Sequence, residues 1–132
     1  MPSPTPAMKA RYLADTIHTA SPAKLLMMLF DRVVLDLVRG EQALLAGNRP
    51  EANTQLLHAQ DIISELHMSL DMDAWAGSAG LAQLYVFAVT ELVNANVKGD
   101  AAKVGSIREL IEPLRDTWRT AASAAAAPGV SR

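Results

Sequence analysis

Residues 19–31 read Thr-Ala-Ser-Pro-Ala-Lys-Leu-Leu-Met-Met-Leu-Phe-Asp, and we expect the rest of the chain to pack around this segment. Ser21 is a residue type that caps the N-terminal end of a helix, because its hydroxyl accepts a hydrogen bond from an unpaired backbone N–H of the first turn. Pro22 suits the first helical position, where its fixed φ is favourable and no N–H is needed. A helix is therefore predicted to begin at Pro22 and to run at once into six apolar residues, 25–30.

This helix is predicted to reach about Ala46, where Gly47 can adopt the left-handed conformation that ends helices. At roughly 100° per residue, its apolar side chains form two neighbouring stripes and leave a few residues outside both. One stripe holds Leu26, Phe30, Val33, Leu37 and Leu44, the other holds Met27, Val34, Val38 and Leu45, and the residues outside are Leu25, Met28 and Leu35. A surface helix normally has one apolar arc. The excess predicts either nearly complete burial or a partner for the additional surface.

The composition limits the class of protein. A chain of 132 residues suits one domain, and the absence of cysteine excludes disulfides and thiolate metal sites. A net charge of −2 gives no electrostatic reason to expect nucleic acid as a partner. The chain has neither a signal-peptide pattern nor an apolar run long enough to span a bilayer, so we expect a cytoplasmic protein without membrane insertion. With 50% apolar residues and few aromatics, the expected class is all-α.

Three further helices are expected downstream. The second begins at Pro50, the third spans residues 81–98 after a loop over 71–80, and the fourth follows a tight reversal at Gly99-Asp100. The short connections favour an antiparallel up-down four-helix bundle, preceded by a short N-terminal strap or helix. We therefore divide the chain into a flexible leader and strap (1–18), a bundle domain (19–122) and a disordered tail (123–132).

Apolar spacing also predicts which side chains form the core. The expected members are Leu26, Phe30, Leu37, Ile63, Leu84 and Trp118. The helix over 81–98 is apolar nearly all round, which predicts that it is the most buried of the four. In the fourth helix the apolar period continues on both sides of Pro113, so we expect a kink there and not an end.

No catalytic or metal site is predicted, and we expect no enzyme activity and no cofactor. His18, His58 and His67 are not spaced as ligands on one helix face, and the sequence has no phosphate-binding loop or nucleophile elbow. We expect all three histidines to be solvated. One alternative stays open, because histidine phosphotransfer domains are small four-helix bundles with an exposed histidine on the second helix, a role that His58 would take. The residues after His58, Ala-Gln-Asp-Ile-Ile, lack the lysine or glycine that accommodates a phosphate in such domains.

Short motifs lie in order across residues 12–119 and carry a family resemblance. They are Thr-Ala-Ser-Pro at 19–22, Met-Leu-Phe-Asp at 28–31, Ala-Gln-Asp-Ile-Ile at 59–63, Leu-Tyr at 84–85, Ala-Asn at 95–96 and Leu-Arg-Asp-Thr-Trp at 114–118. Together they resemble the flagellar export chaperone family FliS. That family often has glycine after Met-Leu-Phe-Asp, where this chain has Arg32.

The resemblance implies a protein that binds the C-terminal segment of unpolymerised flagellin, prevents its premature assembly and presents it to the flagellar export apparatus. It also implies that the N-terminal strap can fold over the flagellin groove when no partner is present. The residues expected to bind flagellin match the strap or lie off the core stripes: Tyr12, Ile17, Leu25, Met28, Leu35, Leu57, Ser64 and Met68. An unfilled groove leaves open whether the free protein forms a homodimer.

Overall fold

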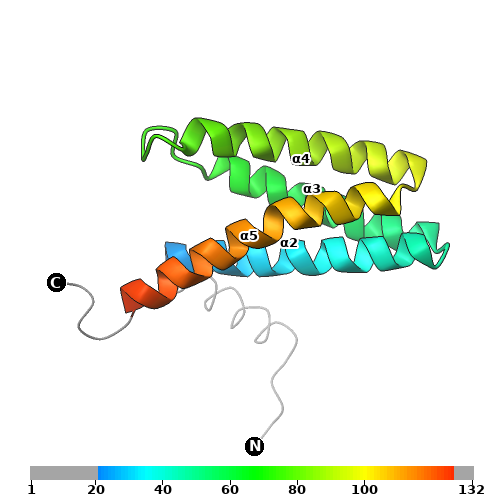
Figure 1. Cartoon of the computed structure of the whole chain (residues 1–132), viewed down its shortest axis with the longest axis horizontal. Coiled ribbons are helices and arrows are strands. Elements are labelled where there is room, and N and C mark those ends of the chain that lie inside the picture. The colour runs from blue at the N-terminus through cyan, green and yellow to red at the C-terminus, as the bar shows by residue number, and fades with distance from the viewer. Residues whose placement is uncertain (1–20, 127–132) are drawn as a thin grey trace, which may run out of the picture.

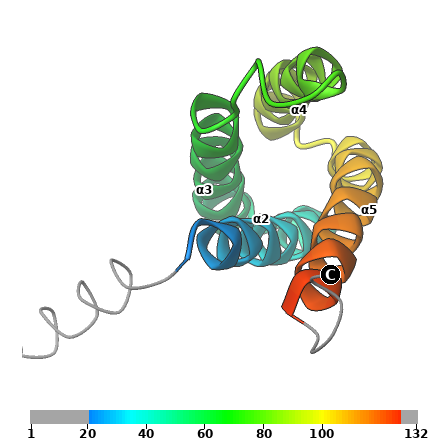
Figure 2. The same ribbon diagram turned by 90° about the vertical axis from the view of Figure 1, so that its left-hand side faces the viewer.

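The computed structural model of the protein describes residues 21–126, and this part of the chain contains four helices and no strand. The helices are α2 (Pro22–Leu45), α3 (Arg49–Met68), α4 (Ser78–Lys98) and α5 (Ala101–Ala126). Consecutive helices run in opposite directions and pack side by side, and α5 returns to pack against α2 (Figure 1). Viewed toward the end of the bundle, the four helices surround a common centre (Figure 2). The prediction of an all-α, antiparallel four-helix bundle is confirmed.

Two predicted segments lie wholly or partly outside the described residues. The leader and strap fall in residues 1–20, together with Tyr12, Ile17 and His18, and the end of the tail falls in residues 127–132. At the other end of the bundle domain, α5 continues to Ala126, past the predicted boundary at residue 122.

Ser21 and Asp100 both cap the helices that follow them, as the sequence predicted. The hydroxyl of Ser21 accepts from the backbone N–H of Lys24 at 3.1 Å, and a carboxylate oxygen of Asp100 accepts from that of Lys103 at 3.0 Å. In contrast, α4 begins at Ser78 and not at residue 81, and its N-terminal cap has no side-chain hydrogen bond. The Ser78 hydroxyl instead donates to the carbonyl of Asp71 at 3.0 Å, which ties the preceding loop to the start of α4.

Gly99 and Arg49 together fix the reversal between α4 and α5. Gly99 has φ of 67°, in the left-handed region that glycine adopts without steric cost. Arg49, the first residue of α3, donates through Nη2 to the carbonyls of Asn96 at 2.9 Å and Val97 at 3.1 Å. The last carbonyls of a helix have no partner within it, so the guanidinium caps α4 from the neighbouring helix.

The predicted core members fall into two groups. Completely buried are Phe30, Leu37 and Ile63. Partly buried, and packed against the edge of the core, are Leu26, Leu84 and Trp118. The first group confirms the predicted apolar faces, whereas the second lies where the core meets the surface.

The prediction that the helix over 81–98 is the most buried of the four was wrong. On its inner side, α4 buries Leu81, Tyr85, Ala88, Leu92 and Ala95. Its outer side carries Val86, Phe87, Val93 and Val97, which are between 42% and 74% exposed. Each helix of this bundle packs on two neighbours and buries one face, so an all-round apolar helix leaves apolar side chains outside.

Candidate partner-binding surface

An apolar pocket of about 600 Å³ lies between the N-terminal half of α2 and the C-terminal part of α5, and we call it the α2–α5 pocket. Its lining residues are Pro22, Ala23, Leu25, Leu26, Met27 and Leu29 of α2, Trp118, Ala121 and Ala122 of α5, and Ser69 at the end of α3. Ala121 and Ala122 have small side chains, so they leave the space beside Trp118 unfilled. Concave apolar surfaces of this kind are typical binding sites.

A second pocket of about 200 Å³ adjoins the first at this end of the bundle. The two pockets share Leu26, Ser69 and Trp118. The smaller one extends to Tyr85 of α4 and to Trp75, an exposed residue of the loop between α3 and α4. The two pockets therefore give this end of the bundle an apolar surface that reaches residues of all four helices.

The predicted binding residues within the described range do not gather at one place. Of these, only Leu25 lines the α2–α5 pocket. The others are exposed on the outer faces of α2 and α3: Met28 and Leu35 on α2, and Leu57, Ser64 and Met68 on α3. The structure therefore divides them between a pocket and two helix faces.

Sequence reasoning missed the exposed apolar residues of α4 and most of the pocket lining. The signal was present, because α4 has no charged residue before Glu91. A lack of charge on a helix fits surplus apolar surface as well as burial, and in α4 it reflects exposed apolar side chains. The pocket gave no such signal, because its two walls come from opposite ends of the described chain.

A buried carboxylate joins α2 to α3 and was not predicted from the sequence. Asp36 is completely buried, and its Oδ1 accepts from Arg32 Nε at 2.9 Å. Its Oδ2 contacts Nδ1 of His58, which comes from α3 and is half-exposed. A carboxylate only accepts hydrogen bonds, so the proton lies on Nδ1 of the imidazole. His58 is therefore exposed, as expected, but it also forms a contact between two helices that the sequence did not predict.

The described part of the chain holds neither a metal-binding cluster nor a helix that could span a membrane. Within residues 21–126, no three histidine, aspartate or glutamate side chains are placed to hold a metal ion together. Over the same range, none of the helices combines the length and the apolar character that crossing a bilayer requires. The phenol of Tyr85 is buried, and burial raises its pKa to about 12.

A comparison with known families decides how this surface is interpreted. A sequence model of the family described as "Flagellar protein FliS" matches residues 4–125, which include α2, α3, α4 and nearly all of α5. The chain belongs to the FliS family.

Three FliS relatives show that the similarity extends over most of each chain. Each is named flagellar secretion chaperone FliS, and they come from Vibrio cholerae, Bacillus subtilis and Escherichia coli. The Vibrio protein is 33% identical over 113 residues, covering 85% of this chain and 83% of the relative. The Bacillus protein is 28% identical over 110 residues (83% and 82%), and the Escherichia protein is 30% identical over 107 residues (80% and 79%). FliS membership therefore rests on the whole bundle and not on one motif.

FliS membership confirms the resemblance that the motifs indicated. FliS is a family of flagellar secretion chaperones, and a chaperone is not an enzyme class. Arg32, at the position where the resemblance led us to expect glycine, pairs with Asp36 in the contact between α2 and α3.

Proposed function

We propose that this chain is a cytoplasmic export chaperone that binds the C-terminal segment of flagellin, prevents its premature polymerisation and keeps it competent for flagellar export. The observation that carries the proposal is the α2–α5 pocket, whose lining is almost entirely apolar. Membership of the flagellar secretion chaperones supports flagellin as the partner. It also supports delivery of flagellin to the flagellar export apparatus.

The described surface suits a partner that is disordered alone and partly helical when bound. An amphipathic helix binds by placing apolar side chains, spaced three and four residues apart, into a groove. The α2–α5 pocket would take one such face. Methionine side chains adapt their shape easily, and Met27 in the pocket and the exposed Met28 offer that adaptability. The exposed apolar faces of α3 and α4 extend the surface for a longer segment.

We further propose that residues 1–18 form a strap that covers the α2–α5 pocket when flagellin is absent. Pro22 and Ala23 line the pocket, so the described chain begins beside it, at Ser21. Tyr12 and Ile17 would supply apolar contacts to the pocket or to flagellin. Each buried apolar side chain contributes roughly 1.5–3 kcal/mol, and ordering the backbone costs roughly 1–2 kcal/mol per residue. A strap with these few anchors would be displaced by a partner that buries more surface, and a second copy of the chain is a further candidate for the uncovered pocket.

The direct test is calorimetry with a peptide from the C-terminal end of a flagellin encoded in the same genome. We expect binding with a negative heat-capacity change, because apolar burial coupled to ordering produces that signature. The peptide should also gain helicity in far-ultraviolet circular dichroism. A scrambled peptide of the same composition is the control. No heat and no heat-capacity change at several temperatures would refute the chaperone function.

Variants then separate the binding surface from the core. Met28 and Leu57 are about half exposed and Ile63 is completely buried. Met28→Asp and Leu57→Asp should each lower the affinity for the peptide about tenfold or more, equivalent to about 1.4 kcal/mol. Both variants should lose little stability. Ile63→Asp should instead destabilise the fold, because it buries an unpaired charge. Gln42→Asp, on an exposed part of α2 far from the pocket, is the matched control. Equal losses of stability in the first three variants would show that this division of the surface is wrong.

A further inference from the structure

The two parts of α5 are held to the bundle in different ways. The first part, up to Glu112, buries Val104, Ile107 and Ile111 in the core. It is also joined to both neighbouring helices by ion pairs. Arg108 Nε lies 3.2 Å from Glu41 Oε1 on α2, and Lys103 Nζ lies 2.7 Å from Glu91 Oε2 on α4.

Beyond Pro113 these attachments become fewer, and we call residues 114–126 the distal segment. Leu114 and Trp118 of this segment are only partly buried. Among the described residues, one ion pair joins the distal segment to another helix, between Arg119 and Asp31 of α2. Both side chains of this pair are half-exposed, so water screens it and it holds the segment weakly. Arg115 pairs with its own neighbour, Asp116, and not with α2.

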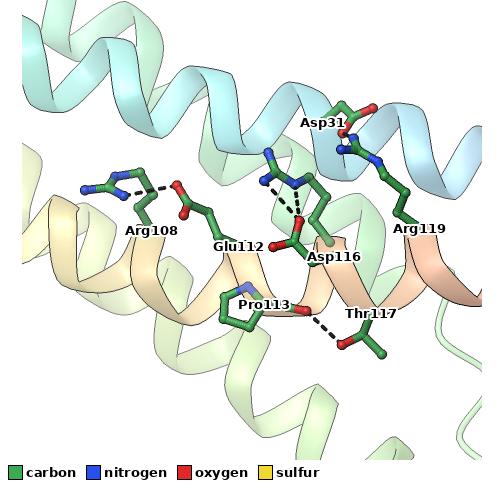
Figure 3. Close-up of polar contacts among 8 residues, drawn as sticks. Asp31, Arg108, Glu112, Pro113, Asp116, Thr117 and Arg119 are labelled. Carbon is green, nitrogen blue, oxygen red and sulfur yellow. Dashed lines mark hydrogen bonds and ion pairs between the residues drawn. The ribbon is translucent and has the colours of Figure 1, made fainter.

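Two features that bend helices lie at Pro113 and Thr117, where the contacts of α5 with its neighbouring helices become fewer. Pro113 has no N–H, so the carbonyl of Glu109 lacks its helical partner, and the proline ring crowds the preceding turn. One turn later, the hydroxyl of Thr117 donates to the carbonyl of Pro113 at 2.8 Å, a contact that often bends helices. Figure 3 shows Pro113 and Thr117 on the side of α5 away from α2, whereas Arg119 reaches toward Asp31. A kink at Pro113 would therefore have two local causes in adjacent turns.

The distal segment is also one wall of the α2–α5 pocket, through Trp118, Ala121 and Ala122. We propose that α5 is hinged at Pro113, and that the distal segment moves relative to α2 to adjust the width of the pocket, with the Arg119–Asp31 pair holding the narrow state. The hinge belongs to the free chain, and only its use in admitting flagellin rests on the proposed function. A pocket of adjustable width would accept apolar side chains of different sizes along one partner segment.

Distance measurements by electron paramagnetic resonance test the hinge in the free protein. The chain has no cysteine, so spin labels report only the introduced pair. Lys24→Cys with Thr120→Cys spans the pocket, and Gln42→Cys with Glu109→Cys spans α2 and the first part of α5 as a matched control; all four residues are exposed. We expect the distance distribution across the pocket to be about twice as broad as the control distribution.

Further variants identify the pivot and the holding contact. Pro113→Ala should narrow the distribution across the pocket toward that of the control pair, and Asp31→Asn should broaden it. Thr117→Ala should narrow it in part, whereas Ser106→Ala should not, although Ser106 makes the same hydroxyl contact, to the carbonyl of Ala102, in the first part of α5. Equal widths for the two label pairs, or a pocket width unchanged by Pro113→Ala, would overturn the hinge.

Hydrogen exchange provides a second measurement that needs no labels. Amides of residues 116–122 should exchange as one group, about tenfold faster than those of Val104–Ile111, and Pro113→Ala should slow only that group. A frayed helix end would instead give protection that decays gradually toward Ala126, which would overturn the hinge. If the flagellin peptide binds while both measurements show one rigid α5, the hinge is wrong and the chaperone function stands. If the hinge is found and no peptide binds, only the chaperone function is wrong.

Discussion

Removing Asp36 and removing His58 should change the stability of the protein by different amounts, although the two side chains contact each other. The Asp36 carboxylate is completely buried, whereas its two partners, Arg32 and His58, are both half-exposed. Removing a partner therefore leaves a buried charge with one hydrogen bond fewer. Removing the carboxylate instead lets both partners return to water.

The magnitudes follow from this geometry. A hydrogen bond to a charged group contributes about 1.5–3 kcal/mol. Because water can enter the space left by a half-exposed imidazole, we expect His58→Ala to cost about 2 kcal/mol, near the lower end of that range. Replacing buried ion pairs by apolar residues is often neutral, so Asp36→Leu should lie within about 1 kcal/mol of the wild type. In the double variant Asp36→Leu/His58→Ala, the loss of His58 should change the free energy of unfolding by almost nothing beyond the effect of Asp36→Leu.

Urea unfolding followed by circular dichroism measures these free energies, and the coupling follows from the double-mutant cycle. His67→Ala is the matched control, because His67 is an exposed histidine of the same helix. The centroid of its ring lies 6.4 Å from the centroid of the Tyr85 ring. Because the side chain of His67 forms only this tilted ring contact among the described residues, we expect the control to lower the unfolding free energy by less than about 1 kcal/mol. If His58→Ala and His67→Ala cost the same, the contact contributes nothing and the reasoning from buried charge fails.

Two further predictions concern the backbone reversal and the buried phenol. Gly99→Ala should lower the unfolding free energy by about 2–3 kcal/mol. It places alanine at a left-handed φ, and its Cβ, 2.3 Å from Nη1 of Arg49, would move the guanidinium off the carbonyls of Asn96 and Val97. Gly47→Ala, with φ of 73° and no atom within 4 Å, should cost about 1 kcal/mol in the same urea assay, and equal costs would exclude a role for Arg49. The pKa of Tyr85 is raised from 10.0 to about 12 in the folded protein, so the unfolded chain loses this proton first as the pH rises. The unfolding free energy should be unaffected below about pH 10 and fall by up to about 2–3 kcal/mol toward pH 12, and the fall should be absent in Tyr85→Phe.

Local sequence features determined the elements of this protein and their order. Ser21 and Pro22 set the start of α2, and Gly99 with Asp100 set the reversal into α5, because capping and left-handed conformations depend on a few adjacent residues. Apolar spacing identified Phe30 and Ile63 as core, since the helical period decides which side chains share a face. The motifs spread over the chain also indicated the family that the comparison confirmed.

Tertiary structure alone decided how much of each face is covered. Helical spacing places Asp36 on the buried side of α2, but only the packing of α3 brings His58 to it. The exposed side of α4 and the α2–α5 pocket likewise depend on where neighbouring helices lie, and Trp118 reaches the pocket only because α5 returns to α2. The period of a helix specifies the direction of each side chain, whereas its burial depends on the distance and angle of other helices, which no single segment contains.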